Sequence, residues 1–404
     1  MRLLSLSNCP LELSQGSGYV VLRYSEGLRQ RGHGLNLYGP EQFEPLPRLG
    51  GRFRSWRLAL GMAAWALAAL LPWRRPRPQL IECYGAESWL AIALLRLCPG
   101  RPRLVIHANG LETHFYGTLI AASRQGLVPH PYGSWHQPNP LRLFAWAFRH
   151  ADALVTVSHA EARYALAHGY QPPQRLLALP NPLDPLWLDQ PCQPSAELLI
   201  GYCGSWLPSK GCGLLAEALG PVLRRHPAWR LLLIGVGAAF EPAAWFAPEL
   251  LPRLEIVPHE RDKQRLQALY RRQAIACFPT LFESFGLALA EAMSCGVACL
   301  STATGFAADL RHGEQAWLLP PPPTPAAIAA GLEALIASAD LRQRLARGGH
   351  EAVQGLRWPP AIDALERFYE SLLTPSGPNG DRQRGTSPPS AASATTSSAE
   401  QRST

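Results

Sequence analysis

Short apolar runs alternate with helix-like segments along the first half of the chain, and this alternation restricts the fold more than any other feature. Residues 2–6 are predicted to form a strand, residues 19–31 a helix that ends at Gly32, and residues 35–38 a second strand. A strand, a helix and a strand in succession form a unit whose two strands run parallel, with a covered sheet face. Further strands are predicted in this half at residues 80–83, 104–107 and 153–157.

The second half repeats the pattern after a proline-rich stretch. Residues 179–194 hold five prolines and no periodicity, so we expect a linker there. Beyond the linker the pattern predicts strands at residues 198–202, 231–234, 254–257, 275–278 and 298–301, and helices at residues 210–225, 262–272 and 286–295. Two such series predict an α/β protein of two doubly wound parallel sheets. Ligands of such sheets bind at the carboxyl ends of the strands, so we expect the site in a cleft between the domains.

Composition narrows the class of protein. The 404 residues are 47% hydrophobic and 17% charged, which suits two packed cores and argues against a coiled coil or a wholly disordered chain. The net charge of +8 favours anionic partners, but the basic residues are spread along the chain, so no nucleic-acid partner is expected. Only two of the basic residues are lysines, Lys210 and Lys263, which makes each a candidate for a specific role.

Cysteine usage and hydropathy predict the location in the cell. The nine cysteines are scattered without the spacing of a zinc site, which fits a reducing cytosol. The first residues become polar after Ser7, unlike a secretory signal. The longest apolar run, residues 58–71, is too short to cross a bilayer core of about 30 Å. Residues 374–404 contain no Val, Ile, Leu, Phe, Tyr or Trp, so we expect a disordered tail on a cytoplasmic protein.

The stretch from Phe278 to Gly296 carries the most chemical information. The predicted strand ends at Phe278, a loop carries Glu283, and Gly286 opens a helix that carries Glu291. The free N–H groups at a helix start bind anions, and glycine lets the backbone approach a ligand. A carboxylate repels phosphate but accepts hydrogen bonds from a ribose diol. The pattern suggests a site for a phosphorylated ribose. The same residues would also fit a helix with no binding role, with an exposed glutamate at Glu291 and a capping-like Glu283.

The spacing of the two glutamates resembles a known motif. Glu283 and Glu291 are separated by seven residues with Phe285-Gly286-Leu287 between them, and this resembles the E-x7-E motif of retaining glycosyltransferases of family 4. Weaker similarities to the family follow in its order at residues 19–33, 151–158, 179–184, 201–211 and 233–237. The resemblance extends over residues 1–373 and implies the GT-B fold, in which two Rossmann-like domains face each other across a cleft.

The resemblance also implies a division of the chain. An acceptor-side domain would occupy residues 1–185, and a nucleotide-sugar-binding domain residues 195–357. A helix at residues 358–373 would cross back to the first domain, and the tail at residues 374–404 would follow.

The same resemblance implies roles for residues of the second domain. Glu291 would hold the ribose of the donor nucleotide, and Glu283 would contact the donor sugar. The N–H groups of Phe285, Gly286 and Leu287 would face sugar and phosphate oxygens. These five residues are therefore the predicted core of the donor site.

The cation expected at the donor diphosphate is Lys210. The leaving diphosphate gains negative charge in the transition state, so a fixed cation there lowers the barrier. The family is usually metal-independent, so no metal and no other cofactor is expected beside the nucleoside diphosphate sugar. Gly204 and Ser205 precede Lys210 in the same loop and are expected at the donor. The family usually has arginine where this chain has Ser205, so one of two diphosphate cations is missing, and its effect on activity stays open.

The first domain offers further candidates. The family often has a histidine near the reacting sugar, in the stretch that corresponds to residues 107–114. Alignment of the Gly-Leu-Glu in this stretch puts Asn109 in the histidine's place, with His107 two residues earlier. Residues two apart in an extended segment share a face, so His107 joins Glu283 and Lys210 as a candidate catalytic residue. Gly18 lies in a glycine-rich turn that comes near the donor diphosphate in the family.

Two segments of the first domain allow more than one interpretation. Residues 58–71 are apolar with arginines on both sides, which predicts either a buried helix or an interfacial segment that contacts anionic lipid at the inner face of the membrane. Residues 115–140 show no clean periodicity, and we expect a long acceptor loop there.

These features together predict a function. The protein would be a retaining hexosyltransferase that moves a sugar from a nucleoside diphosphate sugar to a glycan or lipid-linked acceptor, in cell-surface polysaccharide or glycolipid synthesis. One alternative is a nucleotide-sugar epimerase of the GT-B type. Another is a catalytically inactive binder of nucleotide sugars, which Ser205 and Asn109 suggest. The donor base, the sugar, the acceptor and the oligomeric state stay open.

Overall fold

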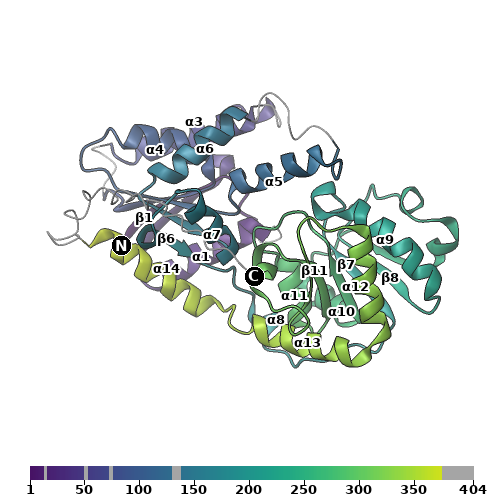
Figure 1. The fold of residues 1–404 in the computed structure, drawn as a ribbon. Coiled ribbons are helices and arrows are strands. Elements are labelled where there is room, and N and C mark those ends of the chain that lie inside the picture. The colour runs from purple at the N-terminus through teal and green to yellow at the C-terminus, as the bar shows by residue number, and fades with distance from the viewer. Residues whose placement is uncertain (13–15, 50–52, 72–75, 130–137, 375–404) are drawn as a thin grey trace, which may run out of the picture.

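The computed structural model describes residues 1–12, 16–49, 53–71, 76–129 and 138–374 (Figure 1). The predicted disordered tail therefore lies outside the described residues, except for Thr374. Part of the predicted acceptor loop, residues 130–137, also lies outside them.

The first domain is built on a sheet of six parallel strands in the order β2-β1-β3-β4-β5-β6. Strands of a parallel sheet are buried on both faces and are therefore apolar along their length. Every residue of β3 is buried, Glu82 included. The strands are β1 (Arg2–Ser7), β2 (Gly34–Tyr38), β3 (Leu80–Tyr84), β4 (Arg103–Ala108), β5 (Ala153–Thr156) and β6 (Leu176–Ala178).

Helices cover both faces of this sheet. The N-terminal helix α1 and the last helix of the chain, α14, lie together below the sheet in Figure 1, and α3, α4 and α6 lie above it. The helices of this domain are α1 (Gly16–Gln30), α2 (Pro40–Phe43), α3 (Arg54–Ala68), α4 (Trp89–Leu95), α5 (Glu112–Arg124), α6 (Pro138–His150), α7 (His159–Ala167) and α14 (Trp358–Leu373).

The second domain has the same architecture. Its six parallel strands follow the order β12-β11-β10-β7-β8-β9, which is the Rossmann order. The strands are β7 (Leu199–Cys203), β8 (Arg230–Ile234), β9 (Leu254–Val257), β10 (Ile275–Phe278), β11 (Ala298–Thr302) and β12 (Trp317–Leu319). The helices are α9 (Cys212–Arg225), α10 (Lys263–Arg271), α11 (Leu287–Ser294), α12 (Pro325–Ala337) and α13 (Ala339–Val353).

The predicted two-sheet α/β fold is confirmed, with differences at its edges. Each predicted strand is present within one or two residues, but the two short edge strands β6 and β12 were not predicted. The prediction of a long loop at residues 115–140 is wrong for residues 115–124 and 138–140, because α5 occupies Glu112–Arg124 and α6 begins at Pro138. Its apolar side chains pack partly against the second domain, as Ala122 does against Leu281, so α5 lacks the pattern of a simple one-domain helix.

The chain crosses between the domains twice, at adjacent positions. The first crossing follows β6 and contains the short helix α8 (Pro185–Leu188). The second is the short segment between α13 and α14. The N–H of Leu183 on the first crossing donates to the carbonyl of Leu356 on the second, at 2.8 Å. The two crossings therefore form one connection at one side of the cleft.

Helix α14 belongs to the first domain by packing, although it follows the second domain in sequence. Its buried residues Ile362 and Leu365 share a core with Leu3 and Leu28. The hydroxyl of Tyr369 donates to Oε1 of Glu82, which is fully buried, at 2.7 Å.

The carboxylate of Glu82 is surrounded by donors. The hydroxyls of Ser5 and Tyr84 donate to it at 2.7 and 2.8 Å. Nε2 of His107 lies 3.0 Å from Oε1 of Glu82 and 2.6 Å from the hydroxyl of Tyr369. Burial lowers the pKa of His107, against the opposing effect of Glu82. A buried polar group is tolerated where it is hydrogen-bonded, and here the network ties α14 to the middle of the sheet.

Tyr369→Phe is expected to lower the free energy of unfolding by about 1–3 kcal/mol, because it leaves Glu82 and His107 each short of a buried partner. Urea unfolding followed by circular dichroism measures the change. Ser371→Ala, an exposed change on the same helix, is the control and is expected to stay within about 0.5 kcal/mol of the wild type. Equal stability of Tyr369→Phe and the control would contradict this account of the network.

Candidate functional site

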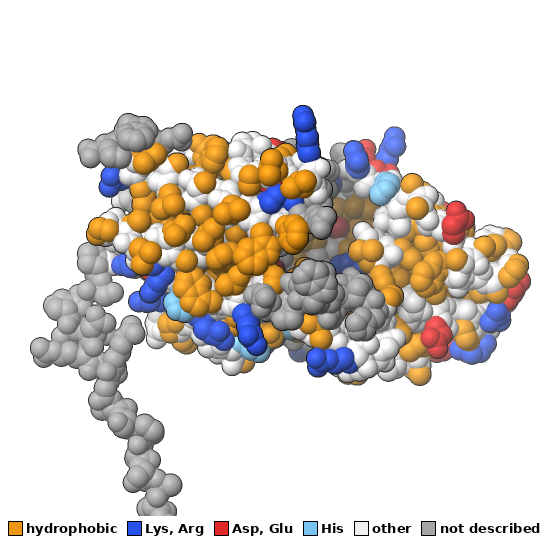
Figure 2. Space-filling view, turned by 90° about the horizontal axis from the view of Figure 1, so that it is seen from above, with side chains coloured by type: hydrophobic (Ala, Val, Ile, Leu, Met, Phe, Trp, Pro, Cys, Tyr) orange, Lys and Arg blue, Asp and Glu red, His pale blue; other side chains and the backbone are white. Residues whose placement is uncertain are grey.

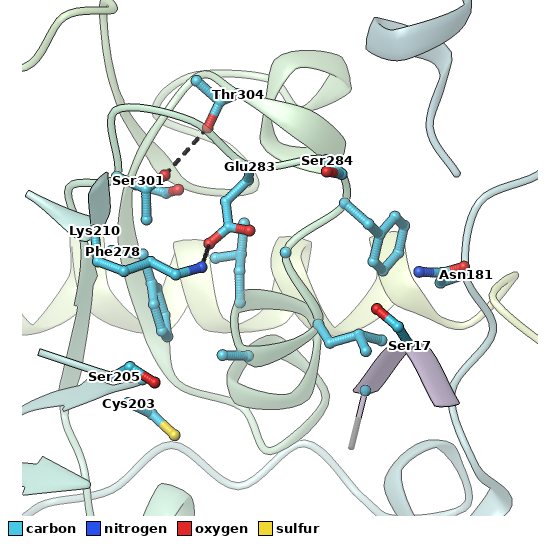
Figure 3. A pocket seen from close by; sticks show the side chains of 18 of the residues that line it. Ser17, Asn181, Cys203, Ser205, Lys210, Phe278, Glu283, Ser284, Ser301 and Thr304 are labelled. Carbon is cyan, nitrogen blue, oxygen red and sulfur yellow. Dashed lines mark hydrogen bonds and ion pairs between the residues drawn. The ribbon is translucent and has the colours of Figure 1, made fainter. Parts of the chain in front are cut away.

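A cavity of about 410 Å³ lies between the two domains (Figure 3). The first domain and the linker contribute Gly16, Ser17, Val20, Asn109 and Asn181 to its lining. The second domain contributes Tyr202, Cys203, Gly204, Ser205, Lys210, Phe278, Thr280, Glu283, Ser284, Phe285, Gly286, Leu287, Ala288, Leu289, Ser301 and Thr304.

The cavity opens where the topology of the second sheet predicts a site. The connection after β7 leads to β8 on one side, and the connection after β10 leads to β11 on the other side. The crevice between β7 and β10 is therefore the switch point of the sheet. Gly204 and Ser205 come directly after β7, and Thr280 and Glu283 follow β10. The sequence prediction of a site at the carboxyl ends of the strands, between the domains, agrees with this position.

The cavity wall carries the start of α11. Its N-cap residue Gly286 has a φ of +101°, a conformation that glycine adopts without strain. The N–H of Ala290 makes the first bond of the helix, to the carbonyl of Gly286. The preceding N–H groups of Leu287, Ala288 and Leu289 have no partner within the helix, and all three residues line the cavity. This end of the helix therefore presents donors and positive potential to the cavity.

Two more features add positive potential. Gly16 and Ser17, the first residues of α1, reach the cavity from the other domain. Lys210 is the one cation among the described residues that line it. Nζ of Lys210 lies 2.5 Å from Oε1 of Glu283, and Figure 3 shows the two side chains meeting over the cavity. Both side chains are partly exposed, at 32% and 24%, so a ligand can reach each of them.

A smaller cavity of about 140 Å³ adjoins the first, and Gly16 and Leu287 line both. Glu291 lines the smaller one. The hydroxyl of Tyr270 donates to Oε2 of Glu291 at 3.3 Å. Burial raises the pKa of Glu291 to about 7, against the lowering effects of Tyr270 and Lys263. A carboxylate with a pKa near neutrality inside a cleft is a common mark of a functional site.

Two family models match the chain, one in each domain. The description "Glycosyl transferase 4-like domain" matches residues 15–182, and "Glycosyl transferases group 1" matches residues 197–338. Between them they match most of both domains. The chain belongs to the group 1 glycosyl transferases.

The chain spans about half the length of the curated relatives that it matches. A phosphatidyl-myo-inositol mannosyltransferase of Mycobacterium tuberculosis is 34% identical over 170 residues, which are 41% of this chain and 44% of the relative. A D-inositol 3-phosphate glycosyltransferase of Corynebacterium jeikeium is 28% identical over 202 residues, 47% of each chain.

Solved structures share the whole fold. A sucrose-phosphate synthase from Thermosynechococcus elongatus matches with a TM-score of 0.69 at 17% identity, over 92% of this chain and 99% of the other. The Anabaena protein HepE, solved with UDP and glucose, matches with a TM-score of 0.61 at 16% identity, over 92% of this chain and 100% of the other. Identities this low show the shared GT-B fold and nothing further.

Most of the predicted donor residues of this glycosyl transferase meet at the two cavities. The larger cavity is lined by the predicted residues Gly204, Ser205, Lys210, Glu283, Phe285, Gly286 and Leu287. Glu291 lines the smaller one.

Two predicted residues lie elsewhere. His107 is buried in the Glu82 network and is not part of the described lining, whereas Asn109 is. Gly18 is not among the described residues that line either cavity, and a Cβ atom there would lie 2.2 Å from the carbonyl oxygen of Pro10. Its role is thus a close approach of α1 to the loop after β1.

Several lining residues were not predicted. Asn181 is buried, and its Oδ1 has no hydrogen-bond partner among the described residues, so it offers an acceptor to a ligand. Thr280, Ser284, Ser301 and Thr304 add hydroxyl groups of the kind that bind sugar hydroxyls. Their position was the only indication in the sequence. Thr280 follows the predicted strand at residues 275–278, Ser301 ends the one at residues 298–301, and Thr304 follows that strand.

The stability of the protein is expected to fall as the pH rises from about 4.5 to 7, through Glu291. Its folded pKa of about 7 lies above the ordinary value of 4.5, so the folded state holds the proton more tightly than the unfolded state. The stabilisation is complete below pH 4.5 and is lost as the pH passes 7, and it amounts to about 3 kcal/mol in full.

Glu291→Gln removes this titration. Relative to the wild type, the variant is expected to gain about 2–3 kcal/mol between pH 5 and pH 8, measured by urea unfolding at each pH. Glu370→Gln, a change at an exposed glutamate of α14, supplies the background. A constant difference between Glu291→Gln and the wild type at all pH values would show that Glu291 is not the titrating group.

Proposed function

We propose that this protein is a retaining glycosyltransferase that uses a nucleoside diphosphate sugar as donor. The observation that carries the proposal is the convergence of two helix starts and Lys210 on one cavity between the domains. Donors of this kind suit a diphosphate, which carries two negative charges and many acceptor oxygens. Structural neighbours bound to UDP or UDP-glucose support a nucleotide sugar as the ligand.

The donor would lie along the two cavities. Its ribose would occupy the smaller cavity, where Glu291 would accept hydrogen bonds from the diol. Its diphosphate would face the start of α11. The sugar would occupy the space near Glu283 and the hydroxyl-bearing residues of the larger cavity. The diphosphate would replace Glu283 as the partner of Lys210. The carboxylate of Glu283 could then accept hydrogen bonds from the sugar.

The proposed reaction is a substitution at C1 of the donor sugar. The bond from C1 to the phosphate oxygen breaks while the acceptor oxygen bonds to C1 from the same face. The acceptor proton passes to the leaving phosphate. Lys210 and the N–H groups of α11 stabilise the charge on that phosphate, so these groups supply what a metal ion supplies elsewhere. Glu283 is proposed to accept hydrogen bonds from the sugar, and no role as a nucleophile is proposed for it.

The acceptor would enter from the first domain, whose Asn109 and Ser17 reach the cavity. We propose a glycan or a lipid-linked molecule as the acceptor at this side of the cleft. The relatives named for phosphatidyl-myo-inositol and for D-inositol 3-phosphate support a polar, hydroxyl-bearing acceptor. No role in proton transfer is proposed for His107, since its ring is used inside the domain.

Binding of UDP, GDP, ADP and their sugar conjugates, measured by calorimetry, tests the donor site. One nucleotide series is expected to bind the wild type. Lys210→Met is expected to bind it about 10–100 times more weakly, because a charge-assisted hydrogen bond is lost. Arg224→Met, an exposed cation removed from α9, is the control and is expected to bind as the wild type does.

Turnover separates the alternatives. Retention at C1 of the transferred sugar, seen by NMR, and activity that survives EDTA would support the proposal. Epimer formation without an acceptor would favour the epimerase, and binding without any turnover would favour the inactive binder. Failure of every nucleotide to bind a folded wild type would overturn all three.

We also propose peripheral contact with an anionic membrane. Helix α3 is a core helix, since Leu58 and Met62 are buried, which answers the open interpretation of the apolar run. A surface patch surrounds its start, and we call it the α3 patch: Leu46, Leu49, Phe53, Trp56 and Leu60, all 42–69% exposed. Figure 2 shows apolar side chains gathered over this side of the first domain.

Charge favours lipid over a protein partner for the α3 patch. Arg48 and Arg54 lie between the residues of the α3 patch in the sequence, and both side chains reach the surface. Apolar side chains beside arginines suit the boundary of a membrane with anionic headgroups. Among the described helices, none is both long and apolar enough to span a bilayer.

Flotation with vesicles tests the patch. The wild type is expected to float with vesicles that contain anionic lipid at low salt, and to be released as salt rises. The double variant Trp56→Ser, Leu60→Ser is expected to lose at least half of this binding, whereas Leu198→Ser, an exposed leucine of the second domain, retains it. Absence of wild-type flotation at low salt would remove the membrane proposal.

A further inference from the structure

Lys263 is the second of the two lysines in the chain, and the proposed reaction does not use it. It is the first residue of α10, and its neighbour Asp262 caps that helix by accepting the N–H groups of Gln264 and Arg265. The side chain of Lys263 lines the smaller cavity together with Glu291 and Tyr19. Its position is therefore set by a capped helix start next to the proposed ribose site.

Lys263 contacts both the linker and the first domain. Its Nζ lies 2.5 Å from Oδ2 of Asp184, in the first crossing between the domains. The same Nζ lies 3.8 Å from the centre of the Tyr19 ring, over its face, and Tyr19 belongs to α1. A cation over an aromatic face is attracted by the negative potential of the ring.

Tyr19 and Asp184 are also joined directly, so the three groups form a closed set. The hydroxyl of Tyr19 donates to Oδ1 of Asp184, and Lys263 uses the other oxygen of the same carboxylate. The ring of Tyr19 packs edge-on against Trp358, at the start of α14, with ring centres 5.9 Å apart. Elements of both domains and the first crossing thus meet around one lysine.

We infer that Lys263 is a positioning residue of the donor site: through Asp184 and Tyr19 it holds the first domain against the nucleoside end of the cleft, and it presents a fixed cation to Glu291. The inference rests on the proposed function, because Glu291 is taken there as the acceptor for the ribose diol. It adds a specific cation to the nucleoside end of a donor site whose other cation, Lys210, lies at the diphosphate end.

The charges around Glu291 show why a cation is needed there. Burial favours the protonated carboxyl, and Asp184 raises its pKa further, whereas Lys263 lowers it. A protonated carboxyl accepts fewer hydrogen bonds from a ribose diol than a carboxylate does. The titratable groups near Glu291 are Lys263 and Tyr270 of α10, Asp184 of the linker, Cys203 of β7 and Cys295 just after α11. Tyr19, Glu260 and Arg261 line the same cavity.

Removal of Lys263 has two effects in this arrangement. It frees Asp184, whose charge then faces Glu291 without a counter-ion, so the pKa of Glu291 rises. It also removes the contact that joins α10 to the face of Tyr19. Donor affinity is expected to fall most at neutral pH and to recover as the pH rises. A side chain with only a packing role would lower affinity equally at every pH.

The test measures affinity against pH for the wild type, Lys263→Met and Lys263→Arg. The probe is UDP-glucose, or the GDP or ADP conjugate if that conjugate is the one that binds the wild type. Sugar conjugates are used because their two phosphates do not titrate between pH 5.5 and 8.5. Arg265→Met, with a side chain that is 77% exposed on the same helix, is the matched control.

Wild-type affinity is expected to rise with a midpoint near pH 7, the pKa of Glu291. Lys263→Met is expected to bind about tenfold more weakly at pH 7, with the midpoint raised by roughly one unit. Lys263→Arg is expected to keep the wild-type midpoint. Tyr19→Phe loses only the bond to Asp184, so its midpoint is expected to stay near the wild-type value while its affinity falls.

The outcomes separate this inference from the proposed function. If no conjugate binds the folded wild type, the proposed function fails first. If the wild type binds and Lys263→Met binds with the same affinity and midpoint, the inference alone is overturned. If Lys263→Met is weaker by the same factor at every pH, Lys263 has only a packing role, and the inference is again overturned.

Discussion

The position of the second domain over the first depends on how α14 is attached, and this attachment centres on the buried carboxylate of Glu82. Tyr369 brings α14 to that carboxylate, and Ser5, Tyr84 and His107 complete the set of groups around it. Because α14 follows α13 after a short segment, fixing the helix also fixes one end of the second domain. The other crossing is bonded to this segment through Leu183 and Leu356, so the cleft has its connection along one side.

Much of the fold was predictable because buried parallel strands leave a clear record in the sequence. Residues 231–234 are apolar throughout, and residues 80–83 are apolar except for Glu82. Strands β6 and β12 were missed because three residues at the edge of a sheet are too few to show a pattern. Helix α5 was missed because its outer side chains face the second domain, a contact that no local period reveals.

The parts of the site formed by backbone groups could be predicted from the sequence. The direction of individual side chains could be predicted less well. Gly286 and the helix start after it, with Glu283 and Glu291 at fixed distances, follow from local geometry. The parity argument for His107 does not extend to Asn109, because β4 ends at Ala108 and Gly110 turns the chain with a φ of +140°. No local sequence pattern indicates that Asn181 lacks a partner among the described residues, or that Lys263 reaches Tyr19.

The return of α14 sets the order in which the two domains are completed during synthesis. The second domain is continuous in sequence from β7 to α13, whereas the first consists of two pieces that flank it. The ribosome therefore releases every residue of the second domain before the helix that covers Leu3 and Leu28. The domain begun first is finished last, and until then the core that awaits α14, with the carboxylate of Glu82 in it, lacks its cover.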